Sequence, residues 1–195
     1  MGIYMPDQSE SQSLPSTLRQ IAFNFRLTGW ISFWSQLVLA VVSSVVLLLF
    51  AVFSNNSTNK ASNPGTGLGI FFALCGLAVL GGSIYWAFRY TRIARQLQSL
   101  NADTRPRKTD TIQVLRLGLL VNLGGMLLTL FGAYAIVGTL AARSISQPQI
   151  GLTLDTSRLI SSLDMFAVQA NINTIFGHFV GIVATLWLMD RVNRT

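Results

Sequence analysis

One stretch of the sequence combines a membrane-like composition with side chains that could bind a metal ion or carry a proton. Residues 165–189 contain no Asp, Glu, Lys or Arg. Four polar residues nevertheless recur at intervals of seven, from the edge of this stretch into it: Asp164, Asn171, His178 and Thr185. Because seven residues complete almost two helical turns, a helix places this series in one stripe. Imidazole and oxygen ligands suit transition-metal ions, and histidine also exchanges protons near neutral pH.

His178 carries the strongest functional signal because of its depth. It is the one histidine of the chain and lies near the middle of this apolar stretch. An ionisable side chain at the centre of a bilayer is costly and usually functional. The sequence leaves two interpretations open: a metal ligand or proton carrier, and a neutral histidine bonded to a neighbouring helix. Cys75 has a comparable depth but is typical of a small buried side chain.

Other apolar stretches carry similar stripes of polar or small residues. The candidates for a transport path or for polar contacts between helices are His178, Asn171, Asp164, Thr174, Asn122 and Gln36, with His178 the candidate metal ligand. Gln169 and Asn173 lie on roughly the opposite side of their helix. The candidates for close helix packing are Gly118, Gly125, Gly132 and Gly76, because small residues let membrane helices approach each other.

The elements that position these residues are membrane spans. The 195 residues are 51% hydrophobic and 11% charged, against about a quarter charged in soluble domains. Four apolar runs reach the length of about 18 residues that indicates a membrane helix, at about residues 27–53, 68–88, 112–142 and 163–189. We therefore predict an all-α integral membrane protein, with residues 16–195 as one four-helix bundle and residues 1–15 as a disordered tail without a signal or transit peptide.

Residues 16–27 are predicted to form a short amphipathic helix on the membrane surface, because Leu18, Ile21, Ala22 and Phe25 recur at helical spacing. The net charge is +7 and reflects topology rather than nucleic-acid binding. Eleven of the fourteen Lys and Arg residues fall in the N-terminal segment, the connection between the second and third spans, and the C-terminus. By the positive-inside rule, both termini are expected in the cytoplasm.

Catalytic signatures are absent from the sequence. It contains no HExxH, CxxC, P-loop or GxSxG motif, and one histidine cannot form a multi-histidine metal site within one chain. We therefore expect a protein that is not an enzyme and has no firmly bound cofactor. Its expected partners are the lipid bilayer and a second copy or another membrane protein.

Three stretches resemble a known family. These are "FRLTGWISFWSQL", "RLGLLVNLGGMLLTLFGAYAIVGTLAARS" and "LDMFAVQANINTIFGHFVGI", which contain a V-N-x-x-G-M core and a V-Q-A-x-x-N-T-x-x-x-H-F run. They are similar to the family of cyanobacterial and chloroplast inner-membrane proteins whose plant members are described as the translocon component Tic-twenty-one and as the iron permease "permease in chloroplasts". The resemblance covers residues 14–192. It implies four spans and a cyanobacterial inner membrane, or alternatively a thylakoid membrane, but no established site.

Two functions follow as hypotheses. The first is a permease, or a permease subunit, for a metal ion, with iron as the transported ion; a path between protomers is favoured over one within a subunit. The second is a non-transporting, translocon-like scaffold that helps other proteins to insert or assemble. A permease requires His178 and Asn171 to face a wet cavity, whereas a scaffold requires them to be satisfied in a dry interior.

Overall fold

A computed structural model describes residues 16–56, 64–98, 107–145 and 162–194. They form four long helices: α1 (Ser16–Asn56), α2 (Pro64–Leu97), α3 (Lys108–Ile145) and α4 (Ser162–Asn193). Each helix is long and apolar enough to cross a membrane. The predicted four-span, all-α fold is confirmed, and the helices extend beyond the predicted spans at both ends. The predicted tail, residues 1–15, lies outside the described residues.

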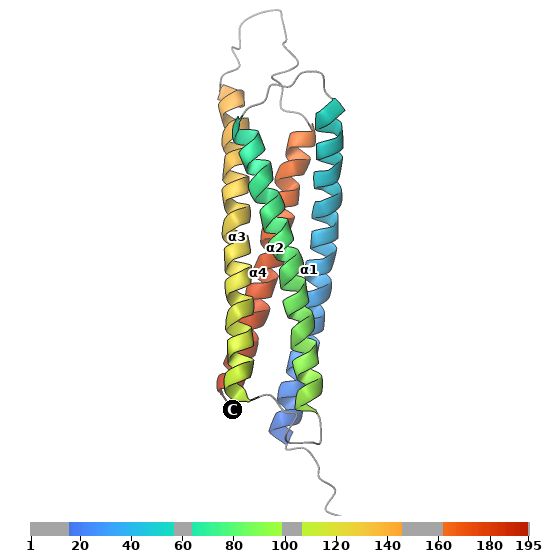
Figure 1. Ribbon diagram of the computed structural model, residues 1–195, viewed down its shortest axis with the longest axis vertical. Helices are drawn as coiled ribbons and strands as arrows, with labels where there is room; N and C mark the ends of the chain where they lie inside the picture. The colour runs from blue at the N-terminus through green and yellow to red at the C-terminus, as the bar shows by residue number, and fades with distance from the viewer. Residues whose placement is uncertain (1–15, 57–63, 99–106, 146–161, 195) are drawn as a thin grey trace, which may run out of the picture.

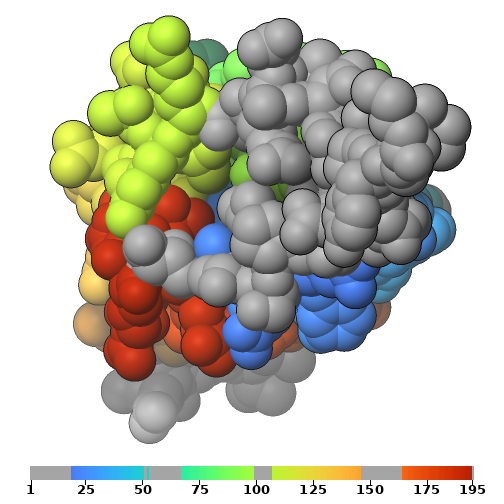
Figure 2. All heavy atoms as spheres, turned by 90° about the horizontal axis from the view of Figure 1, so that it is seen from below, coloured from blue at the N-terminus to red at the C-terminus, as the bar shows by residue number. Residues whose placement is uncertain are grey.

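The helices form a bundle in which each packs against two neighbours, in the order α1, α2, α3, α4 and back to α1. α2 and α4 cross in the view of Figure 1 and also contact each other across the bundle. The start of α1 and the end of α4 lie at the same end, which also holds the end of α2 and the start of α3. We call this the basic end, because the segments that hold eleven of the fourteen Lys and Arg residues meet there. Figure 2 looks onto this end, with the last turns of α4 in red between α3 and α1.

The buried residues of the helices recur at alternating intervals of three and four. In α3 they are Thr111, Leu115, Gly118, Asn122, Gly125, Thr129, Gly132, Ile136 and Leu140. This is the spacing of left-handed bundles, in which one seam of each helix faces its neighbours. The seam positions are mostly small or polar, and the large apolar side chains point outward. That inverted pattern is what a lipid environment permits, because lipid solvates the apolar exterior.

The first turns of α1 correspond to the predicted amphipathic helix. Residues 16–27 are helical, and they continue into the first span without a break. Ala22 and Phe25 are fully buried and belong to an apolar cluster at the basic end, together with Tyr90, Leu115 and Leu188. The predicted helix over residues 16–27 is therefore present and leads into the first span, and its apolar face is covered by the other helices. An apolar face at helical spacing fits a membrane surface and a bundle seam equally well, and here it packs against the other helices.

Candidate functional site

His178 occupies the centre of the bundle, where its imidazole contacts two other helices. The ring is fully buried. Its Nδ1 lies 3.3 Å from the Oδ1 of Asn122 on α3, and its Nε2 lies 3.2 Å from the carbonyl oxygen of Gly76 on α2. Both neighbouring atoms are hydrogen-bond acceptors. A neutral imidazole donates to one of them, whereas an imidazolium donates to both.

Gln36 extends this arrangement to α1. Its Nε2 lies 3.4 Å from Asn122 Oδ1 and donates to the Gly177 carbonyl oxygen at 3.2 Å. Its Oε1 accepts a hydrogen bond from the Ser83 hydroxyl on α2 at 3.3 Å. Gln36, Ser83, Asn122 and His178, one residue from each helix, therefore form a central polar cluster. Asn122 completes its own bonding by donating from Nδ2 to the Gly118 carbonyl oxygen.

Glycines make room for the central polar cluster. A Cβ atom on Gly125 would clash with the His178 ring, and one on Gly181 would clash with Gln36 and Asn122. A Cβ atom on Gly76 would clash with the Thr129 side chain. Close approach of backbones is thus needed here to bring large polar side chains into register.

The remaining packing glycines serve other contacts. Gly118 faces Tyr90 and Trp86, and Gly132 lies against the α2 backbone near Ala73. All four predicted packing glycines are buried at helix contacts. Gly177 and Gly181 were not singled out from the sequence, although their positions one residue before and three residues after His178 place them near the same stripe.

The other predicted site residues are not brought into the central polar cluster. Asn171 and Thr174 are buried and bond to carbonyl oxygens of their own helix, at Ala167 and Ala170. The Oδ1 of Asn171 has no hydrogen-bond partner among the described residues. Asp164 lies at the far end of α4 from the basic end, and its carboxylate is 4.0 Å from the Arg143 guanidinium.

Gln169 and Asn173 face away from the interior. The Gln169 Nε2 donates to the Asn173 Oδ1 at 3.0 Å, and of this pair Gln169 is exposed and Asn173 is half-buried. Their spacing predicts this position opposite the polar stripe. Their surroundings on that face are large apolar side chains, including Phe166, Ile172 and Phe176.

The four residues of the central polar cluster are at most 2% exposed. Two pockets lie between α2 and α3, and neither is lined by His178 or Asn171. Within residues 16–56, 64–98, 107–145 and 162–194, no three His, Cys, Asp or Glu side chains converge as a metal site would require. Cys75 is half-buried and does not approach His178 within hydrogen-bonding distance.

Four apolar helices around a buried polar cluster define a polytopic α-helical membrane protein. A family model described as a protein of unknown function, DUF3611, matches residues 15–193, and the chain belongs to this family. It is 33% identical over 192 residues to "Protein TIC 21, chloroplastic" of Arabidopsis thaliana, which confirms the resemblance to the Tic-twenty-one family. This alignment covers 95% of the chain but 62% of that relative. No solved structure gives a significant match.

Proposed function

We propose that this protein is a non-enzymatic membrane scaffold without a bound cofactor, which assists the insertion or assembly of other membrane proteins through its lipid-facing surfaces. The observation that carries this proposal is where the side-chain amide groups of the protein lie. The amides of Gln36 and Asn122 are bonded within the bundle, whereas those of Gln169 and Asn173 face outward. The surface therefore offers polar contacts to a partner, while the central polar cluster is buried.

The interior argument rests on burial and on hydrogen bonds between helices. His178 and Gln36 are both fully buried, and His178 bonds to two other helices whereas Gln36 bonds to three. Such a network fixes the register of four helices, because breaking it leaves polar groups in a medium that cannot solvate them. For His178, this arrangement supports a scaffold over a permease with a path through one subunit.

The surface argument rests on Gln169 and Asn173. With a rise of about 1.5 Å per residue, they lie roughly 8 and 14 Å along the helix from Asp164, inside the apolar part of α4. Their mutual bond uses one N–H and leaves further donors and acceptors on both amides. Unsatisfied amide groups in hydrocarbon are costly. A polar side chain of a partner helix would satisfy them.

Site-specific photo-cross-linking in native membranes tests this proposal. A photoreactive phenylalanine analogue replaces Ile172, which lies between the two amides, and a matched control places it at Val137 on the outer face of α3. We expect adducts with defined membrane proteins from position 172, lost when Gln169→Leu and Asn173→Leu are combined. The abundance of the assembled partner should fall in cells that carry this double variant. Lipid adducts alone at both positions would contradict the scaffold.

A second candidate function is an iron permease of a cyanobacterial inner membrane. It is supported by the family resemblance and by the unpartnered Oδ1 of Asn171, which is 1% exposed and lies two helical turns from His178. A buried carbonyl oxygen without a donor can accept a bond from a hydrated cation. The ion would reach the stripe through a second conformation or between protomers.

Uptake of ferrous iron into sealed liposomes tests the permease. Wild type is compared with His178→Ala, with Asn171→Ala and with empty liposomes, after circular dichroism has confirmed helical folding in each sample. The scaffold predicts no uptake above empty liposomes. Uptake by wild type that collapses in both variants would establish the permease and overturn the scaffold.

A further inference from the structure

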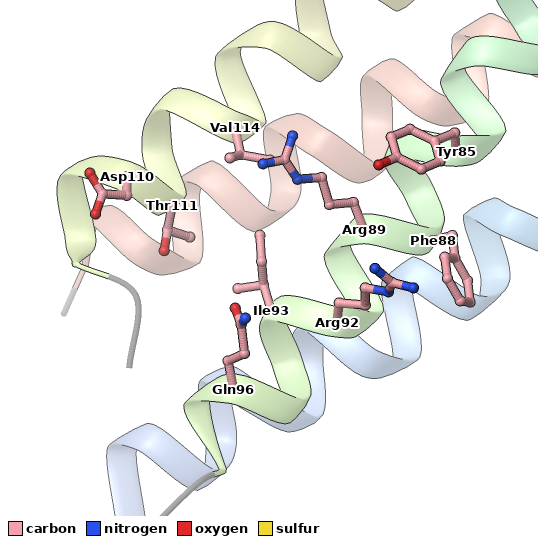
Figure 3. Close-up of a pocket in the computed structure, with 9 residues that line it drawn as sticks. All are labelled: Tyr85, Phe88, Arg89, Arg92, Ile93, Gln96, Asp110, Thr111 and Val114. Carbon is pink, nitrogen blue, oxygen red and sulfur yellow. The ribbon is translucent and has the colours of Figure 1, made fainter. Parts of the chain in front are cut away.

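A pocket of about 450 Å³ opens between the last turns of α2 and the first turns of α3 at the basic end (Figure 3). Its lining combines aromatic, cationic and acidic side chains, among them Tyr85, Phe88, Arg89, Arg92 and Asp110. It lies outside the central polar cluster and shares no residue with it. Neither hypothesis for the protein's function uses it.

The pocket spans the boundary between the apolar and the charged part of α2. Residues 67–88 of α2 carry no charge, and arginines begin at Arg89. This change marks the level at which hydrocarbon gives way to lipid headgroups. Tyr85 is exposed on the apolar side of this boundary, and Phe88 lies at it. An occupant would therefore need an apolar part and a charged part.

Two guanidinium groups dominate the charged part. Arg89 and Arg92 are both exposed and, being three residues apart, lie on one face of α2. The Arg92 guanidinium lies over the Phe88 ring at 5.3 Å, which holds it in place beside the aromatic wall. Asp110 faces the same pocket, but within the described residues it forms no ion pair with either arginine. One positive charge remains in excess.

We propose that this pocket binds an anionic glycerophospholipid with hydroxyl groups on its headgroup, such as phosphatidylglycerol. Guanidinium groups match a phosphate with two parallel N–H···O bonds, so Arg89 and Arg92 hold the phosphate. The Asp110 carboxylate accepts a hydrogen bond from a headgroup hydroxyl. The acyl chains run along Tyr85 and Phe88 into the hydrocarbon. This inference does not depend on the proposed function.

Native mass spectrometry of the delipidated full chain tests the site with phosphatidylglycerol, phosphatidylcholine and phosphatidic acid of equal chain length. Wild type should bind phosphatidylglycerol at least tenfold more tightly than phosphatidylcholine. Combining Arg89→Gln with Arg92→Gln should remove this preference, because each basic residue near a membrane surface contributes about 1 kcal/mol, or about fivefold. Asp110→Ala should lower the affinity for phosphatidylglycerol relative to that for phosphatidic acid, which lacks the hydroxyls.

The matched control combines Arg95→Gln with Arg116→Gln, two exposed arginines near the same end that do not line the pocket. This variant should keep the preference for phosphatidylglycerol. An equal loss in the control would overturn the site in favour of a diffuse positive surface. Displacement of the lipid by millimolar inorganic phosphate would also overturn it, because the pocket would then recognise free phosphate. The unfolding temperature of each variant in detergent verifies its folding.

Discussion

The Nδ1 atom of His178 lies 3.3 Å from the Oδ1 atom of Asn122, which joins α4 to α3 midway along the bundle. The other ring nitrogen lies 3.2 Å from the Gly76 carbonyl oxygen on α2. One imidazole thus bridges three helices at the depth where a lone polar group would be least tolerated. The stability of the bundle should therefore be sensitive to the residues around this ring.

Replacement of His178 by Ala should lower the free energy of unfolding by about 2–4 kcal/mol. The change leaves the Gly76 carbonyl oxygen without this partner and opens a cavity in a closely packed seam. Unfolding by sodium dodecyl sulfate in mixed micelles measures the effect. The control is Ile172→Ala on the lipid-facing side of the same helix, which should change the value by less than about 1 kcal/mol. Equal effects of the two variants would contradict the bridging contacts.

Adjacent glycines of α3 should respond oppositely to the same substitution. A Cβ atom on Gly125 would meet the His178 ring and lie 2.7 Å from a Val79 methyl carbon, whereas one on Gly124 would meet nothing within 4 Å. Gly125→Ala should destabilise the bundle by about 1–3 kcal/mol. Gly124→Ala should be neutral or stabilising by up to about 1 kcal/mol, because alanine favours helix. Thermal unfolding in detergent compares them, and a tolerated Gly125→Ala would count against this packing.

Two glutamines offer a matched test of inside against outside. Gln36→Leu removes a side chain that bonds to α2, α3 and α4, so it should lower the free energy of unfolding by about 2–3 kcal/mol. Gln169→Leu removes an exposed amide from the lipid-facing surface and should leave stability unchanged or raise it. Denaturant titration of both variants in one detergent gives the comparison. A large loss for Gln169→Leu would place that residue inside the fold.

Thiol labelling should report a dry interior. In a Cys75→Ala background, Asn171→Cys and Thr174→Cys should resist a membrane-impermeant maleimide, because both positions are buried. Gln113→Cys, exposed near the start of α3, should react fully in the same time. Mass spectrometry of the intact protein counts the modified thiols. Rapid labelling at position 171 or 174 would reveal a water-filled path and favour the permease.

Much of the architecture could be predicted because it depends on local composition. Hydropathy over about 20 residues is enough to indicate each span, and a period of seven is enough to place Asn171, His178 and Thr185 on one face. The depth of His178 follows from counting residues along one helix. These properties need no knowledge of which helix lies beside which.

The tertiary structure decided which side chains contact each other. Asn122 and His178 are 56 residues apart in the chain, and only the side-by-side packing of α3 and α4 brings them together. The same limit applies at the start of α1, where the packing of the bundle decides that the apolar face of Ala22 and Phe25 is covered by other helices. A periodic pattern specifies that a face is covered. What covers it depends on contacts between distant segments, which arise only when the helices pack.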